Sequence, residues 1–170
     1  MDMPRLVLGN GSNVLFVKKR FKGVVLKNEM KGIEFVSEHD DEALLKVASG
    51  EDFDEFIAFC LKKHLHGAEN LSGIPGSVGG AVVQNIGAYG QELRNLVRSV
   101  EYFDFDDYEM HTIDNDGCKF GYRDSIFKHE LLDKTFITSV TFALAKKYVP
   151  IVGYGTLQER LSGYAVLTPD

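Results

Sequence analysis

The sequence lacks several residue types and patterns that mark common protein classes. It has no tryptophan, only two cysteines (Cys60 and Cys118) and only four prolines among 170 residues. Two isolated cysteines give neither a metal-binding spacing nor a disulfide framework. No run of apolar residues approaches a membrane span, and the N-terminus has no secretory apolar region. These absences exclude a membrane partner and a cysteine-based metal site, and they predict a cytoplasmic protein.

The charge balance is also informative. Lys and Arg number 19 against 25 Asp and Glu, which gives a net charge of −6, and the basic residues are scattered. A nucleic-acid partner is therefore not expected. The length suits one good core or two small lobes, which would bury roughly 70% of the unfolded surface. Histidines 64 and 66 lie two residues apart and point to different faces of a helix, so we expect no metal site.

Glycine is concentrated in one apolar stretch. Residues 70–93, NLSGIPGSVGGAVVQNIGAYGQEL, hold six of the 17 glycines, with Gln84 and Asn85 between them. Glycines let the backbone turn sharply or lie against a flat group, and amides both donate and accept hydrogen bonds. The pattern fits an apolar wall for a planar heterocycle with a polar edge. It equally fits a glycine-rich turn between packed elements.

A second glycine-rich segment lies near the N-terminus, at Gly9, Asn10, Gly11, Ser12 and Asn13. A dinucleotide-binding fingerprint would need a third glycine where Val14 stands, and residues 14–17 favour a strand rather than a helix. The Rossmann alternative is excluded. The segment predicts a strand–turn–strand between residues 5–8 and 14–17. Its turn is either an anion-binding nest or a tight hairpin.

The remaining periodicity predicts many short strands and one clear helix. Alternation predicts strands over residues 23–27, 32–36, 43–48, 96–105, 108–113 and 136–145. Apolar residues at helical spacing predict a helix over residues 53–66, with Asp52 as its N-cap and Gly67 as its stop. The acids at residues 104–107 are interpreted as a solvated turn. This order of elements predicts an α+β fold.

Arg123 lies in CKFGYRDSIFKHE (residues 118–130), where it can either bind a carboxylate with its planar fork or pair with Asp124 at the surface. This segment, LGNGSNVLF (residues 8–16) and IPGSVGGAVVQNIGAYGQEL (residues 74–93) together resemble the UDP-N-acetylenolpyruvoylglucosamine reductase family. The three segments occur in the same order as in that family. The resemblance extends from about residue 6 to about residue 157.

The resemblance implies a fold, cofactors and a reaction. It implies an FAD-binding fold of mostly antiparallel strands with a few helices (the PCMH/MurB type), noncovalent FAD, and NADPH as hydride donor. The reaction would reduce UDP-N-acetylglucosamine enolpyruvate to UDP-N-acetylmuramate in peptidoglycan precursor synthesis. We expect three parts: residues 1–30 as the remainder of a first FAD-binding subdomain, 31–148 as a second, and 149–170 as the start of a truncated substrate-binding domain.

The resemblance also assigns residues. Arg123 would be catalytic, and Tyr122, Arg123 and Tyr154 would bind substrate. The cofactor would be bound by residues of the two glycine-rich segments: Gly9, Asn10, Gly11, Ser12, Asn13, Ile74, Pro75, Gly76, Gly79, Gly80, Gln84, Asn85, Gly87, Ala88, Tyr89 and Gly90.

The family's serine proton donor, in a Gly-Ser-Phe context, and its assisting glutamate have no counterpart here. We therefore expect a fragment that does not turn over alone. Two alternatives remain: another FAD-dependent oxidase or dehydrogenase of the same fold, and a noncatalytic remnant.

Overall fold

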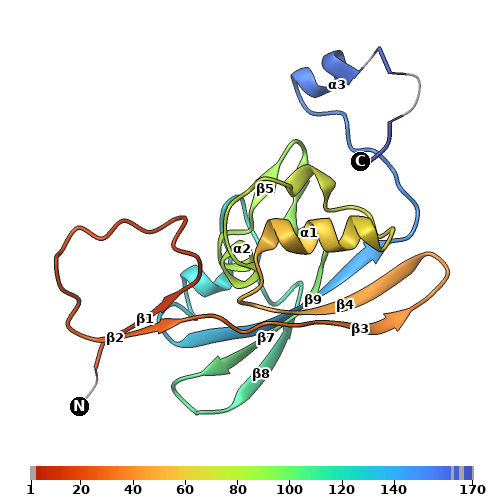
Figure 1. Ribbon diagram of the computed structural model, residues 1–170. Helices are drawn as coiled ribbons and strands as arrows, with labels where there is room; N and C mark the ends of the chain where they lie inside the picture. Colours follow the sequence, from red (N-terminus) through yellow and green to blue (C-terminus); the bar gives the residue numbers. More distant parts are fainter. Residues whose placement is uncertain (1–2, 162, 165–166, 170) are drawn as a thin grey trace.

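The computed structural model describes residues 3–161, 163–164 and 167–169. Its centre is a five-stranded sheet in the order β3-β4-β9-β7-β8, in which every neighbouring pair is antiparallel (Figure 1). The strands are β3 (Ile33–Glu38), β4 (Glu42–Ala48), β7 (Val97–Asp104), β8 (Met110–Asp114) and β9 (Thr135–Ala145). The predicted α+β class and all five of these strands are confirmed.

Two helices, α1 (Phe53–Lys62) and α2 (Val78–Gln84), lie over the same face of this sheet (Figure 1). The main core forms between them and the sheet. Along β4 the side chains Ala43, Leu45 and Val47 are fully buried, alternating with half-buried neighbours, as expected for a strand with one face in the core. Phe142 on β9 is also fully buried and packs against Phe56 of α1, with ring centroids 4.8 Å apart.

Helix α1 begins as predicted and ends early. Asp52 caps it, and its carboxylate accepts hydrogen bonds from the amides of Asp54 and Glu55 at 3.0 and 3.2 Å. The helix stops at Lys62 rather than at residue 66, because His64 adopts a left-handed conformation with φ of 55°. Gly67 was therefore the wrong stop signal.

The N-terminal part differs most from expectation. Strand β1 (Arg5–Leu8) pairs in parallel with β2 (Val24–Lys27), so residues 9–23 form a crossover and not a hairpin. The strand predicted over residues 14–17 is wrong. Parallel pairing requires a long connection between the two strands, and residues 9–23 provide it.

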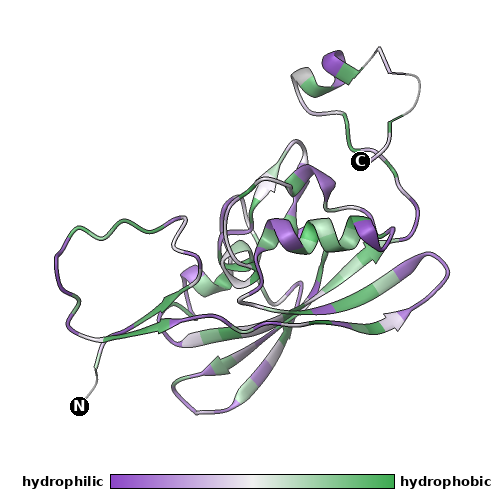
Figure 2. Cartoon of the chain, in the orientation of Figure 1, coloured by the Kyte–Doolittle hydropathy of each residue, from purple (hydrophilic) through white to green (hydrophobic). Residues whose placement is uncertain are grey.

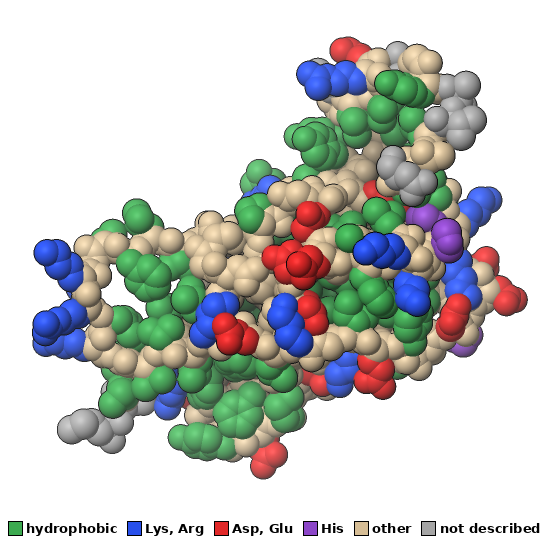
Figure 3. All heavy atoms as spheres, viewed as in Figure 1, with side chains coloured by type: hydrophobic (Ala, Val, Ile, Leu, Met, Phe, Trp, Pro, Cys, Tyr) green, Lys and Arg blue, Asp and Glu red, His purple; other side chains and the backbone are tan. Residues whose placement is uncertain are grey.

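The crossover loop stands out from the body of the molecule (Figure 1). After the polar residues 9–13, the loop has an apolar stretch at residues 14–17 and then a basic stretch at residues 18–22, visible as green followed by purple in Figure 2. Leu15 and Val17 are 84% and 83% exposed. Figure 3 shows apolar and basic side chains of this loop on the outside of the molecule. The β propensity of residues 14–17 therefore lacks the packing that would turn it into a strand.

The glycine-rich stretch contains short elements that the sequence did not predict. They are the 3-10 helix η1 (Glu69–Leu71), helix α2, the hairpin of β5 (Gly87–Ala88) and β6 (Gln91–Glu92), and the 3-10 helix η2 (Leu93–Asn95). The 3-10 helix η3 (Ile126–Lys128) precedes β9, and α3 (Thr156–Leu161) lies in the C-terminal tail, apart from the sheet (Figure 1). Among the described residues, no helix has the length and apolarity needed to cross a membrane.

Candidate flavin-binding site

A cavity of about 630 Å³ lies where the start of the crossover loop, α2, η3 and the beginning of β9 meet. Twelve of the predicted site residues line it: Gly9, Asn10, Gly11, Ser12, Asn13, Ile74, Pro75, Gly76, Gly79, Gly80, Gln84 and Arg123. Two glycine-rich segments that lie far apart in the sequence therefore meet around one cavity, together with the predicted catalytic arginine.

Side-chain hydrogen bonds join the first glycine-rich segment to the second and to the N-cap of α1. The Ser12 hydroxyl donates to the Pro75 carbonyl at 3.0 Å, and the Asn10 amide donates to the Asp52 carboxylate at 3.1 Å. Contact is so close that a Cβ on Gly9 would lie 2.4 Å from Ser77 Oγ. Glycine at this position is thus a requirement of packing between the two segments.

The second segment is fixed to α1 as well. The Gly73 amide and the Ser72 hydroxyl donate to the Asp54 carboxylate at 2.8 and 2.7 Å. These two bonds hold the pKa of Asp54 below its ordinary value, because they favour the charged form. The first turn of α1 therefore anchors the entry to the glycine-rich wall at neutral pH.

Helix α2 presents one face to the cavity. Gly76, Gly79, Gly80, Val83 and Gln84 line it at the three- and four-residue spacing of a helix face. Gly79 also packs against the residue that follows β4, where a Cβ on Gly79 would be 3.0 Å from the Ser49 Cβ. The glycines both bring the helix close to the sheet and leave a flat surface toward the cavity.

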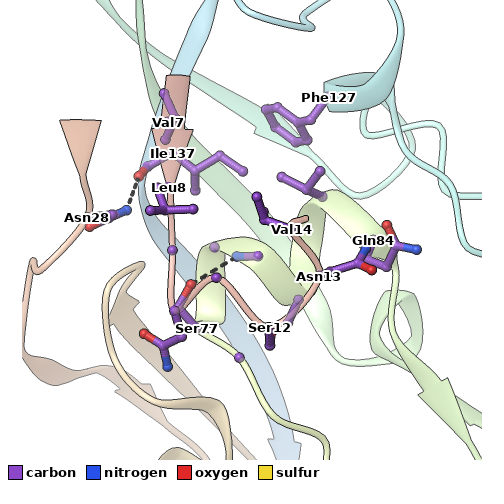
Figure 4. Close-up of a pocket in the computed structure, with 18 of the residues that line it drawn as sticks. Val7, Leu8, Ser12, Asn13, Val14, Asn28, Ser77, Gln84, Phe127 and Ile137 are labelled. Carbon is purple, nitrogen blue, oxygen red and sulfur yellow. Dashed lines mark hydrogen bonds between the residues drawn. The ribbon is translucent and has the colours of Figure 1, made fainter. Parts of the chain in front are cut away.

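The rest of the lining is mostly apolar. Figure 4 shows Val7, Leu8 and Ile137 together on one side, Phe127 on another, and Val14 nearer to Asn13. The side chains of Asn13 and Gln84 lie next to each other at one end of the cavity (Figure 4). Among the described residues, neither the Asn13 amide nor the Gln84 amide nitrogen has a hydrogen-bond partner. The cavity therefore offers apolar walls and free polar groups.

Arg123 approaches the cavity from the loop before η3. Its Nη2 donates to the Gly87 carbonyl at 2.7 Å, and its backbone is left-handed with φ of 55°. The surface ion pair with Asp124 is not formed, because Asp124 instead contacts His129 at 2.7 Å. That hydrogen bond lowers the pKa of Asp124. The guanidinium of Arg123 thus has no carboxylate partner among the described residues.

Seven predicted site residues lie outside this lining. Asn85 is buried and structural: its amide donates to Glu92 and to the Gly121 carbonyl, and its oxygen accepts from the Arg94 amide. Tyr89 and Tyr154 are exposed, and their rings lie edge to face with centroids 6.4 Å apart. The others, Gly87, Ala88, Gly90 and the 87% exposed Tyr122, do not border the cavity. Their roles remain predictions.

Other lining residues were missed by the sequence reasoning. They include Arg5, Leu6, Val7, Leu8, Val14, Asn28, Phe53, Ser77, Ala81, Val83, Ile86, Phe127, Leu131, Leu132, Asp133, Thr135 and Ile137. Of these, Ser77, Ala81 and Val83 were not named individually, but they fall within the wall from Ile74 to Gln84 that the resemblance assigns to the flavin. Nothing in the sequence marked Phe127 or Ile137, which β9 and η3 bring to the cavity.

The donor set fits FAD. Free amides, backbone N–H groups and Arg5 and Arg123 suit a pyrophosphate and the polar edge of a flavin ring, and apolar walls suit its rings. The described lining contains no histidine or cysteine that could form a covalent link. Burial raises the pKa of Cys60 and of Cys118 to about 12, so both thiols stay protonated.

Outside the cavity, the described residues hold one group of possible metal ligands. Asp104, Asp107 and His111 gather at the turn between β7 and β8, where Asp107 and His111 are 2.8 Å apart. That contact is an ordinary ion pair of an exposed turn, and it agrees with the solvated turn predicted there.

Comparison with known proteins places the chain. The family model described as FAD binding domain matches residues 1–114. The UDP-N-acetylenolpyruvoylglucosamine reductase of Aliivibrio fischeri is 47% identical over 158 residues, 93% of this chain and 45% of that protein. The Bacteroides fragilis enzyme of the same name is 42% identical over 167 residues, 98% of this chain and 50% of that protein. The chain thus spans about half the length of the curated relatives it matches.

Solved structures support the same FAD-binding fold. The UDP-N-acetylenolpyruvylglucosamine reductase of Thermus caldophilus superposes with a TM-score of 0.71 at 27% identity, over 95% of this chain and 54% of that one. A cholesterol oxidase of Brevibacterium sterolicum superposes with a TM-score of 0.58 at 19% identity, over 84% of this chain and 30% of that one, and shows the fold alone. The predicted fold class is confirmed. Since the family model covers most of the chain, and covers both glycine-rich segments, this chain belongs to the FAD binding domain family.

Proposed function

We propose that this chain binds FAD noncovalently in the cavity and contributes it to the reduction of a nucleotide-sugar enolpyruvate. The observation that carries the proposal is the meeting of the two glycine-rich segments around one cavity, joined by Ser12 and Pro75. Ligand sites are typically clefts with mostly apolar walls and a few polar groups, and this cavity combines apolar walls with the unpartnered amides of Asn13 and Gln84.

Each part of the lining has a role in this proposal. Gly11, Ser12 and Asn13 hold the pyrophosphate, and the wall from Ile74 to Gln84 faces the flavin ring. Tyr122, Tyr154 and residues 85–90 remain candidates for contacts that form around the outer edge of the cofactor and the substrate. The flavin, when bound, supplies the redox chemistry, and the protein supplies orientation and charge.

Arg123 would act on the substrate. Addition of a hydride to the terminal carbon of an enolpyruvyl group moves negative charge toward its carboxylate. A fixed guanidinium at that carboxylate stabilises the transition state more than the ground state. Arg123 is suited to this because it borders the cavity, is held by the Gly87 carbonyl and has no carboxylate partner among the described residues.

The identity of the substrate is inferred from the names of the relatives and from the family resemblance. We infer reduction of UDP-N-acetylglucosamine enolpyruvate with NADPH as the electron source, in peptidoglycan precursor synthesis in the cytoplasm. The three-part division at residues 30 and 148 belongs to the same proposal. The first part would hold the pyrophosphate loop and the second the flavin wall and Arg123.

The test is substrate binding to the FAD-loaded chain, followed as a change in the flavin absorption spectrum. We expect the enolpyruvyl nucleotide to perturb the spectrum more strongly than UDP-N-acetylglucosamine, which lacks the carboxylate. Arg123→Met is expected to raise the dissociation constant of the enolpyruvyl nucleotide roughly 10- to 150-fold, the range for loss of a hydrogen bond to a charged group.

Arg98→Met is the matched control, because Arg98 is an exposed arginine of β7 paired with Glu42 at 3.2 Å. It should leave substrate binding unchanged. Equal binding of the enolpyruvyl nucleotide to the parent and to Arg123→Met would overturn the role assigned to Arg123.

A further inference from the structure

Lys128, a residue that the functional assignment leaves without a role, lies against the cavity wall at the end of η3. Its Nζ donates to Gln84 Oε1 at 3.3 Å and to the Arg123 carbonyl at 2.8 Å. Lys128 is half-buried, and no carboxylate of the described residues forms an ion pair with it. One cation therefore connects the flavin-facing helix α2 to the loop that carries Arg123.

The chemistry of these groups fixes the orientation of the glutamine. A lysine ammonium has three donors and no acceptor, whereas an amide has an acceptor end and a donor end. Only the oxygen of Gln84 can face Lys128, so its NH₂ group is turned away from the lysine. Gln84 lines the cavity, and its Nε2 has no hydrogen-bond partner among the described residues.

We propose that Lys128 is a positioning residue that holds the Gln84 amide with its NH₂ group toward the cavity, where it donates to an acceptor on the polar edge of the flavin ring. That edge carries carbonyl oxygens and unprotonated ring nitrogens. The inference rests on the proposed function, because it requires FAD in the cavity. Without Lys128 the amide could turn over and present its oxygen, which would repel those acceptors.

Two features keep Lys128 in place. The Arg123 carbonyl is the shorter of its two contacts and anchors the ammonium. Arg123 is itself held by the Gly87 carbonyl, so the acceptor for Lys128 is fixed relative to α2 and β5. The positive charge at Oε1 also polarises the amide and makes its NH₂ a stronger donor. Removal of the charge should therefore weaken FAD binding and lower the reduction potential of the bound flavin.

The experiment compares FAD dissociation constants by flavin fluorescence for the parent chain, Lys128→Met and Lys128→Arg. Lys128→Met is expected to weaken binding about five- to tenfold, as for loss of one neutral hydrogen bond from the Gln84 amide to the flavin, and to lower the midpoint potential. Lys128→Arg retains a donor and a charge, so its FAD dissociation constant and midpoint potential should both lie close to those of the parent chain. Lys119→Met is the control, because Lys119 lies in the same segment but pairs with Glu130 at the surface.

A double-mutant cycle tests whether Lys128 acts through Gln84. In a Gln84→Leu background, Lys128→Met should change the FAD dissociation constant less than twofold. An effect of the same size with and without Gln84, or no effect in the parent background, would overturn the inference. If the parent chain itself does not bind FAD, the proposed function fails instead, so the two failures are distinct.

A measurement on the parent chain covers the case in which Lys128→Met does not fold. In the FAD complex, the Gln84 amide protons should give NOEs to the flavin ring. NOEs from those protons to the Lys128 side chain, with none to the flavin, would show the opposite orientation and contradict the proposal.

Discussion

Gly9→Ala is expected to weaken FAD binding roughly 5- to 150-fold, which corresponds to an overpacking cost of about 1–3 kcal/mol. The new Cβ would lie 2.4 Å from the Ser77 Oγ. Ser77 is buried and caps α2 through the Gly80 amide, so its hydroxyl cannot move without loss of that cap. The first glycine-rich segment must then shift away from the second, and it takes Ser12 and Asn13 out of position. Fluorescence titration with FAD measures the effect.

Removal of the clashing atom provides the control for this prediction. In the double variant Gly9→Ala, Ser77→Ala the nearest remaining atom is the Ser77 Cβ at 3.5 Å, an ordinary contact. We expect the double variant to bind FAD more tightly than Gly9→Ala alone, although loss of the cap costs about 1 kcal/mol of stability. Gly153→Ala, where a Cβ meets nothing within 4 Å, should bind as the parent does. No recovery in the double variant would show that the contact does not control the loop.

Phe142→Ala is expected to lower the free energy of unfolding by about 3–5 kcal/mol, because it empties a large volume in the centre of the core. Phe142 is fully buried on the central strand β9 and packs on Phe56 of α1. Both helices that shape the cavity rest on this core. Chemical denaturation followed by circular dichroism measures the change.

Phe16→Ala removes the same side chain from the crossover loop, where Phe16 is 60% exposed. Its unfolding free energy should stay within about 0.5 kcal/mol of the parent value. A similar loss of stability for Phe16 and Phe142 would mean that the loop packs in solution and that the core has been assigned to the wrong residues.

The large sheet could be predicted because its strands carry a local signal. In β4 every second side chain is buried, and β9 is long enough for its alternation to stand out. The capping of α1 by Asp52 was likewise visible, since the cap and the apolar periodicity occur together. These features depend on neighbours in the sequence.

Helix α2 could not be predicted in this way. Its sequence, VGGAVVQ, contains two glycines, which disfavour helix by about 1 kcal/mol each relative to alanine. The helix is stabilised by tertiary contact, because only glycine allows the close approach of Gly79 to Ser49. The crossover loop shows the converse. Residues 14–17 have strand propensity, but their side chains are exposed and lack the packing that would stabilise a strand.

The candidate site was predicted in part for the same reason. Its glycine-rich segments are local signals, so Ser12, Gly76 and Gln84 were found directly. Ile137 reaches the site from a distant segment, and no short pattern marks it. Phe127 and Lys128 lie in the segment 118–130, but nothing in its sequence distinguishes them from their neighbours.

The central claim is that the cavity between the two glycine-rich segments holds FAD without a covalent bond. The most direct measurement is the visible absorption spectrum of the purified chain after incubation with FAD and desalting, before and after denaturation. We predict close to one flavin per chain, retained on desalting and released completely on denaturation. A colourless protein with a folded circular dichroism spectrum, or flavin that stays attached after denaturation, would contradict the claim.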